Sequence, residues 1–552
     1  MHAGKGSVAM GIYVSLTILP EHIGATGWKK SYEETLSFLQ GCPMQIMGLH
    51  SERIGSGDRL VQTRALEIDG DTPDQRHWHA VGDFESRMTG ESFTFYRNIN
   101  RYRFGSPREK HHAGETADIV KNLMEKEKGT RRVFSEKTQG HPYHLPMLAV
   151  AMLVEDRFPR YAAAGGDIDI RQARNAQMLI KTVLGRDVAI PIVTDARRLY
   201  KRVSLFCRGS KAMERSLYLF RGDESAGLQA ILDTTDRGGL EEWFLGSLRQ
   251  YDSPNRLGTI DLLIQWLNAT QDLPALCHMA CSDKRGPGFN PVEFASALAF
   301  TWLSVPENER DSIAILLKPE GAAYTVDDQF GTVFMDAAGM KGRLLRYFLK
   351  PEKALEILAR SFPAHAGLIR RAFRQRTAQI RADLAQLRRP LQEYAGKAGA
   401  DSDPETGDGS SLLRLTSIEN ASRTQMLMLQ AVAVVVRRGR EFLQRRAAGL
   451  FNGSAARLRD KVLRGAEQQQ LVLTEDAWRW IDAETDKELL GLLLCLLSLK
   501  EREQTLCNVR KAVFESRLLA RGVLKMTHDD ALPAKFKKMP LNRAKPAMGR
   551  VG

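Results

Sequence analysis

The sequence predicts a mainly α-helical, multidomain protein that carries a small α+β unit with an antiparallel sheet at its N-terminus. Its 552 residues exceed what one hydrophobic core usually serves, so several domains are expected. The alternation of apolar and polar residues that is typical of strands ends near residue 105. Beyond that point apolar residues recur at helical spacing, which predicts an irregular helical middle and a C-terminal helical bundle.

Residues 11–105 are expected to form the α+β domain, and residues 1–10 are expected to be a flexible N-terminal segment. From Ile12 to Ile18 apolar and polar residues alternate, and Pro20 ends this half-buried strand. A helical face beginning at Trp28 follows. Further strands are predicted at 45–49, 60–68, 78–84 and 92–99, separated by turns rich in glycine and aspartate.

Residues 106–395 are expected to form the irregular helical domain, in which no fixed repeat is found. Its most strongly specified stretch is 140–202. Pro146 suits the first turn of a buried helix that ends near Arg157, and Asp167 or Asp169 can cap a second helix that Gly185 ends. Thr194 and Asp195 begin a third helix, and a long helix is predicted at 366–394.

A linker is expected at 396–411, because glycine, acidic and small polar residues occur there without an apolar anchor. Long helices at 412–525 predict the bundle, and the basic tail at 526–552 is expected to be disordered. The apolar run at 489–499 is too short to span a membrane, so it is predicted to be a buried core helix.

The formal net charge of +14 favours an acidic partner, either nucleic acid or an acidic protein, although many basic proteins simply carry such charge as a solvated surface. Six cysteines are scattered rather than spaced as a disulfide framework, which favours reduced thiols and a cytoplasmic location. No signal peptide and no membrane association are expected.

The densest cluster of chemically active side chains lies within 140–202. The candidate catalytic residues are His141, His144, Glu155, Asp167 and Asp169. Proline residues bracket the two histidines and disfavour a shared metal on one helical turn, so no metal and no cofactor are expected. The favoured interpretation is structural: the two histidines are polar residues at a helix entry, and Glu155 or Asp156 pairs with Arg157 or Arg160. Nucleotide-binding glycine motifs and the common hydrolase signatures are absent from the sequence, which counts against a common enzyme class.

Two smaller groups also contain possible metal ligands. Cys277 and Cys281 lack a second ligand pair at zinc-site spacing, so they are interpreted as buried apolar residues. His77 and His79 alternate on a predicted strand, which places both imidazoles on one face. Such a pair is more often a surface feature than a ligand pair.

Arginines on two long helices are the main candidates for a binding surface. Arg370, Arg374, Arg381 and Arg388 recur at spacings of four and seven, so they form a stripe that can follow phosphates. A second series contains Arg437, Arg438 and Arg445. Solvated helix faces, or ion pairs to acidic neighbours, would give the same pattern.

The sequence therefore favours a non-catalytic cytoplasmic binding or assembly subunit whose basic helical half contacts nucleic acid or an acidic protein. One alternative is a hydrolase or transferase with its site at 141–169. Another is a protein-binding adaptor that does not bind nucleic acid. The oligomeric state is not indicated.

Overall fold

A computed structural model describes residues 12–54, 57–103, 117–125, 129–222, 224–234, 237–306, 309, 342, 344–400, 410–446, 448–498 and 504–532 of the protein. The chain folds into two compact units, each assembled from separate segments. The first unit comprises 1–38, 97–140 and 144–402, and the second comprises 39–96, 141–143 and 403–552. The stretch 11–105, expected as one domain, is thus divided between the two units.

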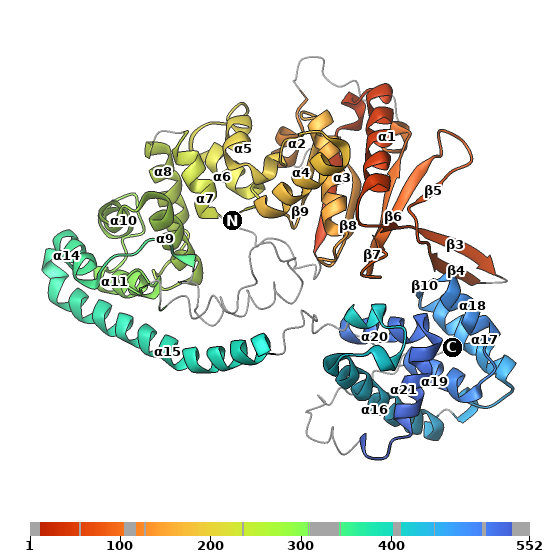
Figure 1. The fold of residues 1–552 in the computed structure, drawn as a ribbon. Coiled ribbons are helices and arrows are strands. Elements are labelled where there is room, and N and C mark those ends of the chain that lie inside the picture. Colours follow the sequence, from red (N-terminus) through yellow and green to blue (C-terminus); the bar gives the residue numbers. More distant parts are fainter. Residues whose placement is uncertain are drawn as a thin grey trace. The chain divides into compact units, whose positions relative to one another are not determined.

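The first unit contains a three-stranded antiparallel sheet in the order β8-β1-β9 (Figure 1). Its central strand β1 (Tyr13–Ile18) was predicted from alternation, and its apolar side chains are buried. The two neighbours, β8 (Arg131–Lys137) and β9 (Ala162–Gly166), come from much later in the chain. Helix α3 (His144–Arg157) packs on β1 and β9, and its side chains from Pro146 to Glu155 are all buried, as its apolar sequence predicts.

Helices make up the remainder of the first unit, together with most of α1 (Ala25–Gly41). Predicted caps are present: Asp169 caps α4 in a capping box, Gly185 ends it in the left-handed region, and Asp195 caps α5. The described residues 345–350 form neither helix nor strand. The helices are α2 (Ile119–Glu125), α4 (Ile170–Leu184), α5 (Ala196–Val203), α6 (Gly209–Leu219), α7 (Glu224–Leu232), α8 (Arg237–Leu248), α9 (Leu257–Thr270), α10 (Leu273–Cys277), α11 (Pro291–Phe300), α14 (Pro351–Ser361) and α15 (Ala366–Ala400).

Helix α15 extends to Ala400 and therefore into the expected linker, of which residues 401–409 lie outside the described part of the chain. The tail from residue 533 onward also lies outside it.

The second unit contains the remaining strands. Strand β6 is central, with β5 and β2 along one edge and β7 along the other, and all these pairs are antiparallel. The hairpin β3–β4 pairs in parallel with β10, a short strand from the C-terminal part of the chain. The strands are β2 (Ile46–Met47), β3 (Leu49–Ile54), β4 (Gly57–Gln62), β5 (Glu67–Asp69), β6 (His77–Asp83), β7 (Thr89–Tyr96) and β10 (Val472–Thr474).

A helical bundle completes the second unit. Its core is one cluster of buried aliphatic and aromatic side chains, to which the apolar run in α19 contributes most, as predicted. The helices are shorter than the long ones expected: residues 484–486 separate α18 from α19, and Ser516 caps α21 directly after α20. The helices are α16 (Arg423–Arg446), α17 (Ala455–Gln468), α18 (Glu475–Ala483), α19 (Lys487–Ser498), α20 (Gln504–Glu515) and α21 (Arg517–Thr527).

Buried polar contacts fix the hairpin to the bundle. The Arg59 guanidinium donates to Asp482 at 2.7 Å and to Glu467 at 3.0 Å, and the Trp478 indole N–H donates to the Leu60 carbonyl at 3.1 Å. Within the described part of the chain, none of the helices combines the length and the apolar composition that crossing a membrane requires.

Candidate nucleic-acid interface

Helix α15 presents its arginines beside a well-packed face. Ile369, Phe373, Thr377, Ile380 and Leu384 are buried and recur at spacings of three and four, which gives one apolar stripe. This stripe packs against α11 and α14, along which α15 runs (Figure 1). Packing therefore fixes which way the remaining side chains of α15 face.

Helix α15 carries exposed arginines that have no carboxylate partner among the described residues. Arg370, Arg371 and Arg374 are exposed, and none of them forms an ion pair with a carboxylate of the described residues. Arg370 and Arg374 lie one turn apart on the same side of the helix, separated by about 6 Å along its axis. The arrangement gives a concentrated positive surface on a rigid element.

The other members of the predicted stripe differ. Arg381 is held by Glu309 through two contacts, of which the Nε–Oε2 distance is 2.7 Å, so its charge is already compensated. Arg388 lies within α15, but its side chain is outside the described residues. Nearby Arg376 places its guanidinium 4.8 Å from the centre of the Phe300 ring.

The second arginine series lies on α16, where several members have partners. Arg437 donates to Asp530 at 2.8 Å and lies 3.7 Å from Glu441, and Arg440 donates to Glu488 at 2.5 Å. Arg438 and Arg445 are exposed and have no ion pair with the described residues. The helix therefore carries both compensated and uncompensated arginines.

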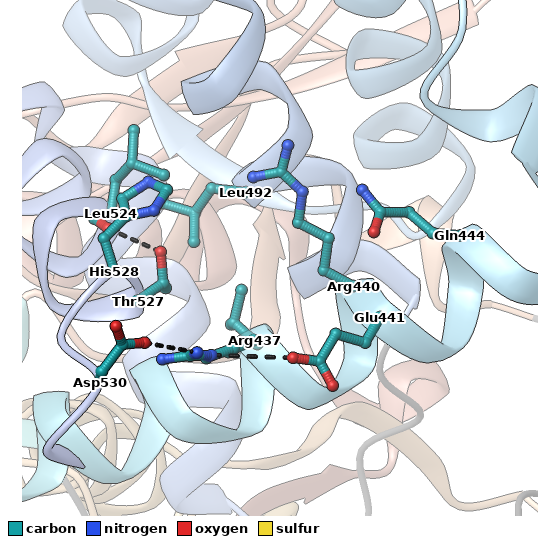
Figure 2. Close-up of a pocket in the computed structure, with 10 residues that line it drawn as sticks. Arg437, Arg440, Glu441, Gln444, Leu492, Leu524, Thr527, His528 and Asp530 are labelled. Atoms are coloured by element: carbon teal, nitrogen blue, oxygen red, sulfur yellow. Dashed lines mark hydrogen bonds and ion pairs between the residues drawn. The ribbon is translucent and has the colours of Figure 1, made fainter. Parts of the chain in front are cut away.

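Arg437 and Arg440 line a cavity of about 340 Å³ in the second unit. Figure 2 shows Arg437 held between Asp530 and Glu441, with Arg440 and Gln444 extending from the same helix. The opposite wall comes from Leu492 of α19 and from the end of α21. Because the two arginines face three carboxylates, counting Glu488, the cavity has no excess positive charge to attract a phosphate.

The candidate catalytic side chains of the first unit have structural partners. His144 is buried with Nδ1 2.7 Å from the Thr138 hydroxyl, and burial lowers its pKa to about 4. Asp169 accepts the Gln172 N–H at 2.8 Å as the cap of α4. Asp167 accepts the Tyr13 N–H at 3.2 Å, and burial raises the pKa of its carboxyl. Asp167 and Asp169 thus hold backbone N–H groups, whereas the buried Nε2 of His144 has no hydrogen-bond partner among the described residues.

Glu155 accepts two backbone N–H groups, from Ala164 at 2.8 Å and from Ile192 at 2.7 Å. Its side chain is fully enclosed, and this burial raises its pKa to about 7. The carboxyl group thus joins β9 to the segment that precedes α5. His141 is also buried, with its ring 6.4 Å from that of Tyr143.

As they lie in the structure, no three His, Cys, Asp or Glu side chains of the described residues are close enough together to hold a metal ion. Cys277 is buried and burial raises its pKa to about 12, which suits a small apolar residue rather than a thiolate ligand. Cys281 is half-buried, and burial likewise raises its pKa.

Sequence reasoning missed the carboxylates that neutralise Arg381 and Arg437. Glu441 lies four residues after Arg437 on the same helix, so helical spacing could have revealed that pair. Glu309 and Asp530 are far from their arginines in the chain, and no sequence signal links them.

Comparison of the chain with protein-family models, with curated proteins and with solved structures gave no match.

Proposed function

We propose that the chain is a non-catalytic binding or assembly subunit that contacts nucleic-acid phosphates through the exposed arginines of α15. The observation that carries the proposal is the group of Arg370, Arg371 and Arg374, which are exposed and uncompensated among the described residues. Guanidinium groups donate two parallel N–H bonds to phosphate oxygens, and a packed helix holds them in register. The net charge of +14 supports attraction to such a polyanion over longer distances.

An acidic protein is the competing partner, because carboxylates also accept from arginine. The two partners differ in their response to salt, since neutralised phosphates release condensed counterions. The enzymatic alternative is less favoured, because Glu155, Asp167 and Asp169 each hold a backbone N–H.

The test replaces Arg370, Arg371 and Arg374 together by Gln, which keeps helix propensity while removing three charges. Fluorescence anisotropy with labelled single-stranded RNA, single-stranded DNA and duplex DNA is measured over a salt series. We expect affinity to fall by about tenfold and the log–log salt slope to become shallower by about 2 to 3 units.

The matched control replaces Lys29, Lys30 and Arg249 by Gln, which removes the same charge from exposed positions on α1 and directly after α8. The control variant is expected to bind almost as tightly as the wild type. Equal losses in both variants would reduce the effect to net charge, and no loss in either would remove nucleic acid as the partner of α15.

A further inference from the structure

Two histidines lie side by side on the sheet of the second unit. The strands β5, β6 and β7 pair in antiparallel fashion, and one face of this sheet buries Trp78, Phe93 and Phe95. The other face carries His77 and His79, which are half-buried. Their ring centres are 5.0 Å apart.

Hydrogen bonds fix which nitrogen of each imidazole is engaged. The His77 Nδ1 lies 2.9 Å from the Gln75 carbonyl oxygen, and because a carbonyl only accepts, Nδ1 carries the proton. The neutral ring then keeps its lone pair on Nε2. The His79 Nδ1 lies 2.9 Å from the hydroxyl oxygens of both Ser92 and Thr94, so it too has local partners.

The His77 hydrogen bond is of the kind that metal-binding histidines make in proteins, and the hydroxyls of Ser92 and Thr94 can accept the corresponding N–H of His79. Such a histidine donates its other ring N–H to a carbonyl or another acceptor, which fixes the tautomer and orients the ligating nitrogen. Two histidines at alternate positions of a strand project from the same face, and the two rings are neighbours on it.

On the neighbouring strand β5, a carboxylate residue lies opposite each histidine. Asp69 is directly opposite His77, and Glu67 is directly opposite His79. Facing positions in an antiparallel pair have Cβ atoms about 5 Å apart. The exposed Asp69 carboxylate at present accepts the Gly70 N–H at 2.6 Å, so a rotation about its side-chain bonds is needed before it can complete a metal site.

We propose that His77 and His79 bind a divalent transition-metal ion of the Zn²⁺ class through their Nε2 atoms, with Asp69 turning to supply a third ligand. Imidazole nitrogen with one carboxylate suits zinc, copper or nickel, whereas Mg²⁺ and Ca²⁺ prefer oxygen ligands. Three protein ligands leave a fourth position for water.

The test is calorimetric titration of the untagged full-length chain with Zn²⁺. The double variant with His77→Ala and His79→Ala is expected to lose one equivalent of bound Zn²⁺ relative to the wild type. The control with His365→Ala and His528→Ala removes the same number of imidazoles from other elements and should retain that equivalent. A wild type and double variant that bind the same number of equivalents would overturn the proposal, as would equal binding of Mg²⁺.

Two further measurements separate ligation from a change in folding. In the wild-type protein, Zn²⁺ should protect His77 and His79 from acylation by diethylpyrocarbonate, read by mass spectrometry; unprotected histidines would contradict the assignment. Thr94→Val removes one hydroxyl beside His79 and tests Thr94 as a positioning residue. It should weaken Zn²⁺ binding by roughly tenfold while leaving the stoichiometry unchanged.

Discussion

The arginines of α15 and those of α16 look alike in the sequence but differ in their surroundings. On α15, Arg370 and Arg374 are exposed without a described counter-charge, whereas on α16 Arg437 and Arg440 are tied to carboxylates and border a cavity. A carboxylate paired with a guanidinium largely cancels the field of the arginine at a distance. An arginine's value for binding therefore depends on whether the fold supplies a carboxylate.

The same distinction applies to the acidic candidates. Glu155 and Asp169 are charged residues with backbone partners, and each joins or caps elements of the first unit. Charged residues with fixed partners should affect stability when they are changed. Those without partners should affect binding when they are changed.

The largest effect on stability is expected from Leu492→Asp, which disrupts the core packing next to the paired arginines of α16. Leu492 is 1% exposed in the core of the bundle and lines the cavity beside Arg440. A carboxylate there would be buried without a partner, at a cost of several kcal/mol. Calorimetry and circular dichroism should show that the cooperative transition of the bundle is lost or shifted far down in temperature.

The conservative change Leu492→Met is the control and should shift the melting temperature only slightly. If Leu492→Asp melted like the wild type, α19 would not be part of the core, and the ion pair of Arg440 with Glu488 would not depend on bundle packing.

The next largest effect is the pH dependence of the contribution that Glu155 makes to the free energy of unfolding. Its folded pKa of about 7 lies above the ordinary value of 4.5, so the folded state holds the proton more tightly than the unfolded state. The stability that this group contributes is fully present below about pH 4.5 and is lost as the pH rises through about 7. The change corresponds to about 3 kcal/mol in the free energy of unfolding.

Denaturant unfolding at a series of pH values measures this contribution. Glu155→Gln removes the titration, so its unfolding free energy should vary less between pH 5 and pH 8 than that of the wild type. The variant should also be less stable at pH 5, because one amide oxygen replaces two carboxyl oxygens that accept the Ala164 and Ile192 N–H groups. The same pH profile in both proteins would show that Glu155 does not carry the effect.

Local signals predicted much of the fold. Alternation predicted β1, and caps at Asp169, Gly185 and Asp195 predicted the limits of α4 and the start of α5. These features depend on side chains within a few residues of one another, so the sequence shows them directly.

Pairing between distant segments was not predictable from the same signals. Strand β1 pairs with β8 and β9, and β10 joins the β3–β4 hairpin from more than 400 residues away. The partner of a strand is set by the whole fold, and β9 with its alanines and glycines has little strand propensity of its own. The candidate interface shows the same limit, because the arginines were evident while Glu309 was not.

The smallest expected effect tests most directly whether a paired carboxylate keeps an arginine of α15 from binding phosphate. Glu309→Gln removes the carboxylate that holds Arg381 while leaving every arginine in place. If α15 contacts phosphates, the released guanidinium adds about one contact, so nucleic-acid affinity should rise and the log–log salt slope should steepen by about 0.7 to 0.9. Arg381→Gln should change binding very little, because that charge is already cancelled in the wild type.

Anisotropy with the same labelled strands measures both variants. The matched control is Glu356→Gln, which removes an exposed carboxylate of α14 that is paired to Lys353 and Arg360. A gain in affinity confined to Glu309→Gln would place Arg381 beside the bound strand, whereas an equal gain in both variants would reflect net charge alone. If Glu309→Gln left binding unchanged and Arg381→Gln weakened it, Arg381 would already contact the partner while it is paired with Glu309.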